Sequence, residues 1–142
     1  MAIVIFLVAH WYLSLFFQTF FMHRYAAHGM FTMTKFWEKV FYVLSFIAQG
    51  SSFLSPRTYG IMHRMHHTYA DTENDPHSPK YDDNLFKMMW KTKDIFSSIF
   101  DGDKEIDERF MKDLPDWFLF EKITNLWFIR CAWGIVYSAI YV

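Results

Sequence analysis

Apolar residues are concentrated near the two ends of the chain, and charged residues lie mainly between them. Residues 2–22 form a run of 21 residues without a formal charge, and as a helix this run would be about 31 Å long, close to the hydrocarbon thickness of a bilayer. Residues 123–142 form a second apolar run, which Asn125 and Arg130 interrupt. We expect Arg130 to reach the cytoplasmic headgroups instead of the bilayer centre. The pattern predicts an all-α integral membrane protein with spanning helices at about residues 2–22 and 123–142.

A polar stripe runs along the first apolar segment. His10, Ser14 and Gln18 recur every four residues and therefore share one face of a helix. Such a face should pack against other protein, and we expect His10 to make a hydrogen bond inside a helix bundle. On one helix His10 would lie about 20 Å from His23, which is too far for both to bind the same metal ion.

Basic residues follow the first apolar run, and none precedes it. Because cytoplasmic segments are enriched in lysine and arginine, Arg24, Lys35 and Lys39 place the end of this span in the cytoplasm. The next apolar run, residues 41–54, is too short to cross a bilayer and should lie at the interface or re-enter. Residues 23–122 are therefore predicted to be cytoplasmic or interfacial, within a single domain that covers residues 1–142.

Five of the seven histidines occur in two short sets, and each set directly follows a largely apolar run. The first set is His23 and His28, and the second is His63, His66 and His67. Neutral imidazole is a common metal ligand, and a cluster without cysteine favours iron, zinc, copper or nickel. The two sets therefore predict a metal site at a membrane surface, with these five histidines as ligands.

The two sets differ in their spacing. In the second set, residues three and four apart share one face of an α-helix, so that its histidines can hold one metal ion or bridge two. In the first set, the five-residue spacing rotates His28 by about 140° from His23 and advances it by about 7.5 Å. That pair should diverge unless the helix ends between its members, and it suits ligands for two different metal ions.

Three polar residues beside the two sets are not predicted to bind the metal. Arg24 and Arg64 each follow a histidine, and we expect both to contact lipid phosphates at the interface. His77 follows Asp75-Pro76 in a turn-rich segment, where we expect it to orient a ligand or contact substrate without binding metal.

Composition and motifs exclude several other functions. A net charge of -1 argues against a nucleic-acid partner, and the only cysteine, Cys131, allows no internal disulfide. The sequence contains no HExxH, no CxxC and no nucleotide-binding glycine pattern. Nitrogen donors next to lipid instead fit the activation of dioxygen, with apolar surroundings that admit an alkyl chain.

The chain resembles the membrane fatty acid desaturases, and within them the acyl-CoA desaturase branch. The resemblance rests on HRYAAH at residues 23–28, on HRMHHTYAD at residues 63–71, and on the Asp-Pro-His sequence at residues 75–77. It implies a di-iron centre held by histidines from three boxes. The implied ligands in this chain are His23, His28, His63, His66 and His67.

The same resemblance implies partners and a location. The partners are dioxygen, a fatty acyl substrate, membrane lipid, and an electron donor such as cytochrome b5 or ferredoxin. The histidine boxes are implied to face the cytoplasm.

The chain departs from the family pattern in two places. No histidine follows His77, so the third box has no counterpart, and we expect an N-terminal portion of a longer enzyme, incomplete at its C-terminus. A degenerate, inactive relative is the alternative. Many acyl-CoA-using relatives carry Arg-Asp before the second box, where this chain has Ile61-Met62. The acyl chain could therefore be linked to CoA, to a lipid or to a carrier protein.

We therefore predict a desaturase segment that inserts a double bond into a fatty acyl chain. Two alternatives remain open at this stage. A di-iron membrane hydroxylase would add oxygen to the acyl or alkyl chain instead of removing two hydrogens. A non-enzymatic, haem-binding membrane cytochrome would show a Soret band.

Overall fold

The computed structural model describes residues 2–82 and 84–141, and the regular elements in this part of the chain are all helices. The all-α prediction is therefore confirmed for the described residues. In order, the helices are α1 (Ala2–Phe17), the π-helix η1 (Gln18–Ala27), α2 (Lys35–Gln49), the 3-10 helix η2 (Gly50–Ser52), α3 (Pro56–Tyr69), α4 (Leu85–Asp101), α5 (Glu108–Met111), α6 (Phe118–Thr124) and α7 (Trp127–Tyr141).

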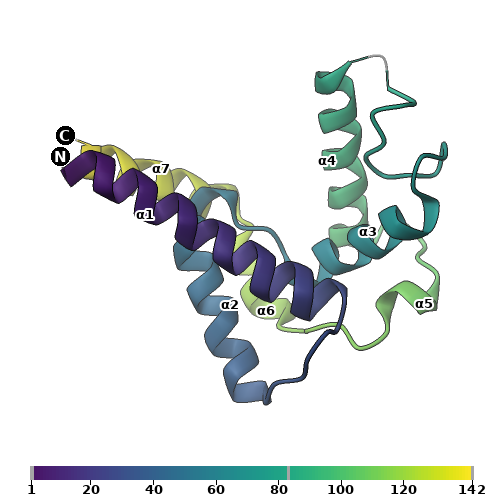
Figure 1. The fold of residues 1–142 in the computed structure, drawn as a ribbon, viewed down its shortest axis with the longest axis horizontal. Helices are drawn as coiled ribbons and strands as arrows, with labels where there is room; N and C mark the ends of the chain where they lie inside the picture. Colours follow the sequence, from purple (N-terminus) through teal and green to yellow (C-terminus); the bar gives the residue numbers. More distant parts are fainter. Residues whose placement is uncertain (1, 83, 142) are drawn as a thin grey trace.

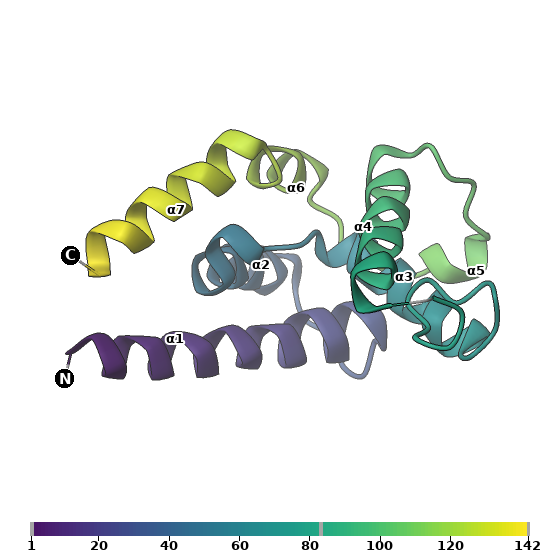
Figure 2. The ribbon, with the colours of Figure 1, turned by 90° about the horizontal axis from the view of Figure 1, so that it is seen from above.

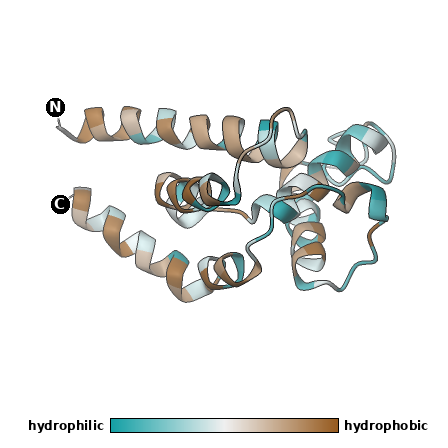
Figure 3. Ribbon diagram, turned by 90° about the horizontal axis from the view of Figure 1, so that it is seen from below, coloured by the Kyte–Doolittle hydropathy of each residue, from teal (hydrophilic) through white to brown (hydrophobic). Residues whose placement is uncertain are grey.

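The helices form two parts that meet near the end of η1 (Figure 1). α1 and α7 lie at one end of the molecule together with both chain termini, and Figure 2 shows α2 between them. α3, α4 and α5 form the opposite end. Hydrophobic residues dominate α1 and α7, whereas hydrophilic residues are frequent around α3 and its neighbouring loops (Figure 3). We call these the apolar part and the polar part.

α1 and η1 form one continuous helix. Within it, Ile3–Ala27 spans 25 residues and is long and apolar enough to cross a membrane. The predicted span ended at residue 22, so the helix continues further than expected. This extension places His23 on the helix itself and makes His28 its C-cap residue.

The second predicted span is divided in the structure. Phe118–Thr124 and Trp127–Ile140 are bent by 59° at a short break. By length and composition alone, the described residues therefore offer one candidate span, or two if the bent pair is counted as one.

Arg130 in α7 binds protein carbonyls. Its guanidinium donates to the carbonyl oxygens of Ser51 at 2.7 Å and Phe53 at 3.1 Å, and to Oδ1 of Asn125 at 2.8 Å. We expected it to reach lipid headgroups. The structure differs because η2 packs against α7, so that the carbonyls of Ser51 and Phe53 lie within reach of the guanidinium.

α1 and α7 contact each other through His10, whose Nε2 lies 3.3 Å from the hydroxyl of Tyr137. This is the predicted hydrogen bond inside a helix bundle. Gln18 is exposed, so the predicted polar stripe is only partly covered. α7 packs closely on η2 because Gly50 has a φ of +55° and no side chain, and a Cβ there would overlap the Tyr137 hydroxyl.

Two clusters of buried hydrophobic residues hold the helices together. The first joins η1 to α2 and to the segment after η2, and consists of Phe21, Met22, Tyr42 and Phe53. The second joins α3 to α4 and α5, and consists of Ile61, Met62, Met65, Ile99 and Phe110. α3 is thus fixed at the junction between the apolar and the polar part.

Candidate metal centre

Four of the five predicted ligands converge where η1 meets α3. His28 Nε2 lies 3.2 Å from His23 Nε2 and 3.1 Å from His63 Nε2, and His67 Nε2 lies 3.0 Å from His63 Nε2. The four ligand nitrogens all lie within 4.8 Å of one another. We call His23, His28, His63 and His67 the four-histidine cluster.

The helix type explains why the first pair converges. We expected His23 and His28 to diverge unless the helix ended between them, because five residues on an α-helix rotate a side chain to another face. The helix does end between them, at Ala27, and its last turns are π-helical, with the His28 amide donating to the His23 carbonyl at 3.1 Å. An i to i+5 hydrogen bond stacks residues five apart on one face. The HxxxxH spacing is compatible with this turn but does not by itself predict it.

The second pair is positioned by α3. His63 and His67 are four residues apart on this helix, which begins with Pro56 and whose first turn is capped by the Ser55 side chain. One turn before His63, the ring of Tyr59 stacks on the imidazole with centroids 5.5 Å apart. Sequence reasoning missed Tyr59, although its four-residue spacing from His63 could have indicated the contact.

The donor set fits a metal ion. A neutral imidazole nitrogen offers either one hydrogen or one lone pair, so the three successive Nε2 contacts cannot all be good hydrogen bonds. A cation that accepts lone pairs from all four nitrogens removes this conflict. Metal–nitrogen bonds of about 2.1 Å bring ligands at right angles to about 3 Å from one another, which is the spacing found here.

The protonation states of His28 and His63 also suit metal binding. Burial, followed by the neighbouring imidazoles of His23 and His67, lowers the pKa of His63 to about 4. Burial, followed by the neighbouring side chains of His23, His67 and Arg64, also lowers the pKa of His28. These two rings are therefore neutral at pH 7, which is the form that binds a metal.

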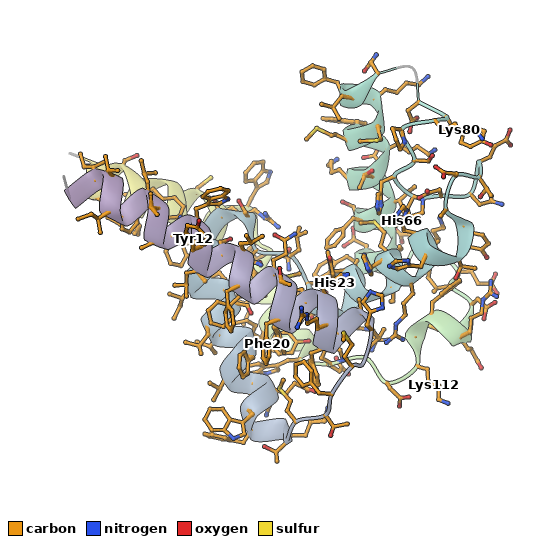
Figure 4. All side chains as sticks on the ribbon, in the orientation of Figure 1. Tyr12, Phe20, His23, His66, Lys80 and Lys112 are labelled. Atoms are coloured by element: carbon orange, nitrogen blue, oxygen red, sulfur yellow. The ribbon has the colours of Figure 1, made fainter. Side chains whose placement is uncertain are left out.

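His66, the fifth predicted ligand, lies beside the cluster in a second group. Its ring centroid is 6.4 Å from that of His63, and its Nδ1 lies 2.8 Å from Oδ1 of Asp75. His77 stacks on the His66 ring with centroids 4.0 Å apart. The ligand atoms of His66, Asp75 and His77 lie within 4.8 Å of one another. Figure 4 shows His66 on α3, beyond His23 at the end of η1.

Asp75 is a buried carboxylate that sequence reasoning had assigned no role. Burial alone would raise its pKa, but hydrogen bonds from His66 and from the backbone N–H groups of His77 and Asp71 outweigh this effect and lower it. An ionised Asp75 accepts the hydrogen of His66 Nδ1 and directs Nε2 outward. The Asp-Pro-His turn was the signal for this contact.

The two arginines beside the boxes differ. Arg24 is exposed, so its contact with lipid phosphates stays a prediction. Arg64 instead donates to the backbone carbonyls of Ala26, Ala27, Phe110 and Lys112. The lipid contact expected of Arg64 is therefore wrong, because its donors are used inside the protein.

A largely apolar groove of about 820 Å³ runs between α4 and the start of α7. Met88 and Phe96 line it on α4, and Trp127 and Arg130 line it on α7. His77 also lines the groove, so the groove reaches the group that contains His66.

Comparison with known proteins decides which family this site belongs to. The family model described as fatty acid desaturase matches residues 1–141. The chain belongs to the fatty acid desaturase family. The resemblance predicted from the histidine boxes is confirmed at this level, and the four-histidine cluster is consistent with the metal site of a desaturase.

Several plant desaturases are similar to this chain. In Arabidopsis thaliana, Delta-9 desaturase-like 2 protein is 30% identical over 122 residues, which are 84% of this chain and 38% of the relative. Delta-9 acyl-lipid desaturase 2 is 35% identical over 68 residues, which are 48% of this chain and 21% of the relative. Delta-9 desaturase-like 4 protein is 34% identical over 73 residues, which are 51% of this chain and 23% of the relative.

The desaturase chain spans between about a fifth and two fifths of the length of these relatives. No solved structure matches it.

Proposed function

We propose that this chain forms part of a membrane fatty acid desaturase that inserts a double bond into a fatty acyl chain. One observation carries the proposal: four imidazole nitrogens, two from each of the family's first two histidine boxes, lie within 4.8 Å of one another. In the proposed reaction the acyl chain loses two hydrogen atoms. Dioxygen takes up these two hydrogen atoms together with two further electrons and two further protons, so that two waters form. The electrons come from a donor such as cytochrome b5 or ferredoxin.

The proposed cofactor is a di-iron centre. His23, His28, His63 and His67 would hold one iron. His66 would bind the second iron through Nε2, while its Nδ1–H donates to Asp75. Bound iron supplies the activation of dioxygen that removal of hydrogen from unactivated carbons requires. The family resemblance implies further ligands from a third histidine box, which these 142 residues do not contain. We therefore propose that this chain works as part of a longer enzyme.

The groove between α4 and α7 is the proposed site of the acyl chain. Its walls are mainly apolar, which suits an alkyl chain, and His77 connects it with His66. A lipid-linked chain is favoured for two reasons. Ile61-Met62 stands where many acyl-CoA-using relatives have Arg-Asp, and one similar protein is named an acyl-lipid desaturase.

The proposed location is the membrane, with both histidine sets on the cytoplasmic side. The apolar helix Ile3–Ala27 supports a span that ends at the first set. α2 has 15 residues, or about 22 Å as a helix, so it is too short to carry the second set to the other side.

The test is iron content and product analysis of the desaturase that contains this chain. We expect iron in the purified protein and an oxygen-dependent unsaturated product by mass spectrometry. His63→Ala should abolish both, because His63 Nε2 contacts the nitrogens of His28 and His67. His10→Ala is the matched control and should retain iron, since His10 contacts Tyr137 instead.

Other outcomes would replace the proposal with one of its alternatives. A product with one added oxygen would identify a hydroxylase, and a Soret band would identify a haem protein. An iron-free protein without an unsaturated product would contradict the desaturase assignment.

A further inference from the structure

Arg64 uses all three of its guanidinium nitrogens inside the protein. Nε donates to the Ala27 carbonyl at 2.7 Å, and Nη2 donates to the Ala26 carbonyl at 3.2 Å. Nη1 donates to the carbonyls of Phe110 at 3.2 Å and Lys112 at 2.6 Å. One side chain on α3 thereby binds the ends of two other helices.

These carbonyls are available because they lie at helix ends. The last four carbonyls of a helix have no partner within the helix. Ala26 and Ala27 are the last two residues of η1, and Phe110 and Lys112 lie at the end of α5. A planar guanidinium spreads five donors over three nitrogens and can reach four carbonyls on two helix ends, whereas the three donors of a lysine ammonium sit on one nitrogen and cannot reach all four.

Gly60 lets the two helices approach closely enough for these bonds. It lies four residues before Arg64 and therefore on the same face of α3. A Cβ at Gly60 would lie 3.1 Å from the Ala26 carbonyl oxygen and 2.7 Å from Cδ2 of Leu114. A methyl group here would displace the end of the Leu114 side chain and would require the last turn of η1 to give by a few tenths of an ångström.

The contact lies directly between the two histidine pairs. Arg64 follows His63 in the sequence, and Ala27 precedes His28. The guanidinium therefore holds the peptide beside His28 against the residue beside His63, and the Nε2 atoms of these two histidines are 3.1 Å apart. A shift of the η1 end relative to α3 would change the distances between the two pairs.

We propose that Arg64, seated by Gly60, is a positioning residue that holds the pair on η1 and the pair on α3 in register for one metal ion. The inference rests on the proposed metal-binding role of the four-histidine cluster. Arg64 acts through backbone carbonyls, so it touches neither metal nor substrate. Its shape matters more than its charge, which separates this role from an interfacial lipid contact.

The test uses cobalt(II) as a spectroscopic probe of the detergent-solubilised protein, with Arg64→Lys as the variant. Lysine keeps the charge but cannot reproduce the four hydrogen bonds. We expect cobalt affinity to fall by about 10- to 100-fold, as for other residues that orient metal ligands. We also expect the visible spectrum at saturating cobalt to change, because the ligand geometry changes. Arg24→Lys is the matched control, since Arg24 also follows a box histidine but is exposed.

Gly60→Ala is the second variant, and it leaves the guanidinium intact. It should lower the cobalt affinity and change the spectrum in the same direction by shifting α3 from η1 by a few tenths of an ångström, so the proposal stays testable if Arg64→Lys does not fold.

An Arg64→Lys protein with a lower melting temperature but the wild-type spectrum at saturating cobalt would overturn the proposal, because Arg64 would then serve stability alone. Wild-type protein that binds no cobalt would instead contradict the proposed metal site itself. The two failures are therefore distinguishable.

Discussion

Asp75 accepts hydrogen bonds from three donors: the His66 ring and the backbone N–H groups of Asp71 and His77. Two of these bonds shape the turn, and the third fixes the His66 ring. A single buried carboxylate therefore couples the geometry of a loop to the orientation of an imidazole. This is the arrangement by which carboxylates commonly orient histidine ligands.

Asp75→Asn should weaken metal binding at His66. The asparagine oxygen can replace one acceptor, but its NH2 group would face a backbone donor that now lacks a partner. We expect about a 10- to 100-fold loss of affinity at the second metal position, measured as iron content across a chelator titration of the full desaturase.

Asp94→Asn is the matched control, because Asp94 is exposed and its contact is with Lys93. Equal iron retention in both variants would show that Asp75 serves only the turn.

At the residue scale, the sequence indicates which side chains can bind metal but not which of them meet. His23, His28, His63 and His67 were predicted as ligands, and they converge. Their grouping depends on a π-helical turn and on how α3 docks against η1, and neither is encoded by spacing alone. The role of Arg64 was missed for the same reason, since its partners are backbone carbonyls far away in the sequence.

At the element scale, α3 is held at its start by a buried polar network. The Ser55 hydroxyl accepts from the Thr58 amide at 3.0 Å and donates to Glu121 Oε2 at 2.6 Å, and Tyr42 donates to Glu121 Oε1 at 2.7 Å. α2, α3 and α6 thus meet at one carboxyl group. Since α3 carries three of the five box histidines, this network fixes the position of the second box.

Ser55→Ala should therefore destabilise the protein more than loss of an ordinary helix cap. Losing the cap costs about 1 kcal/mol, and leaving the buried Glu121 oxygen without its donor costs about 1–3 kcal/mol more. Thr34→Ala is the control, because Thr34 caps α2 through the Trp37 amide at an exposed position.

The measurement for this pair is the free energy of unfolding in detergent. Equal losses for the two variants would show that Glu121 does not depend on Ser55.

Helix boundaries were predictable only where the apolar pattern was uninterrupted. A helix does cover the first apolar run up to residue 22, and its continuation to Ala27 was missed because His23 and Arg24 are polar. The second run was read as one helix. The hydrogen bond from the Asn125 amide to the Glu121 carbonyl closes α6, and the chain then changes direction before Trp127. Apolar composition alone does not report such a break.

For the whole molecule, the hydropathy in Figure 3 separates an apolar part from a polar part, and the four-histidine cluster lies where η1 contacts α3, between them. This arrangement supports a metal centre close to a membrane surface. It also requires that the chain does not cross the membrane between the two histidine sets.

Cysteine labelling tests this topology. In a Cys131→Ser background, Thr32→Cys and Thr68→Cys place single thiols at exposed positions after the first and second sets. Both should react with a membrane-impermeant maleimide from the same, cytoplasmic side of sealed vesicles. The unmutated protein, whose one cysteine is Cys131 in α7, is the control. Its thiol should stay unlabelled from either side if α7 lies in lipid. Labelling of the two threonine positions from opposite sides would mean that α2 crosses the membrane.

His28 and His63 are separated by 35 residues along the chain, although their ring nitrogens nearly touch. An ion bound by both would act as a covalent-like cross-link that closes a long loop and restricts the unfolded chain. By analogy with a disulfide, closing such a loop is worth about 3–4 kcal/mol. With one cysteine, the chain cannot make an internal disulfide. A bound metal ion would therefore link η1 to α3 in a chain that cannot link them by a disulfide.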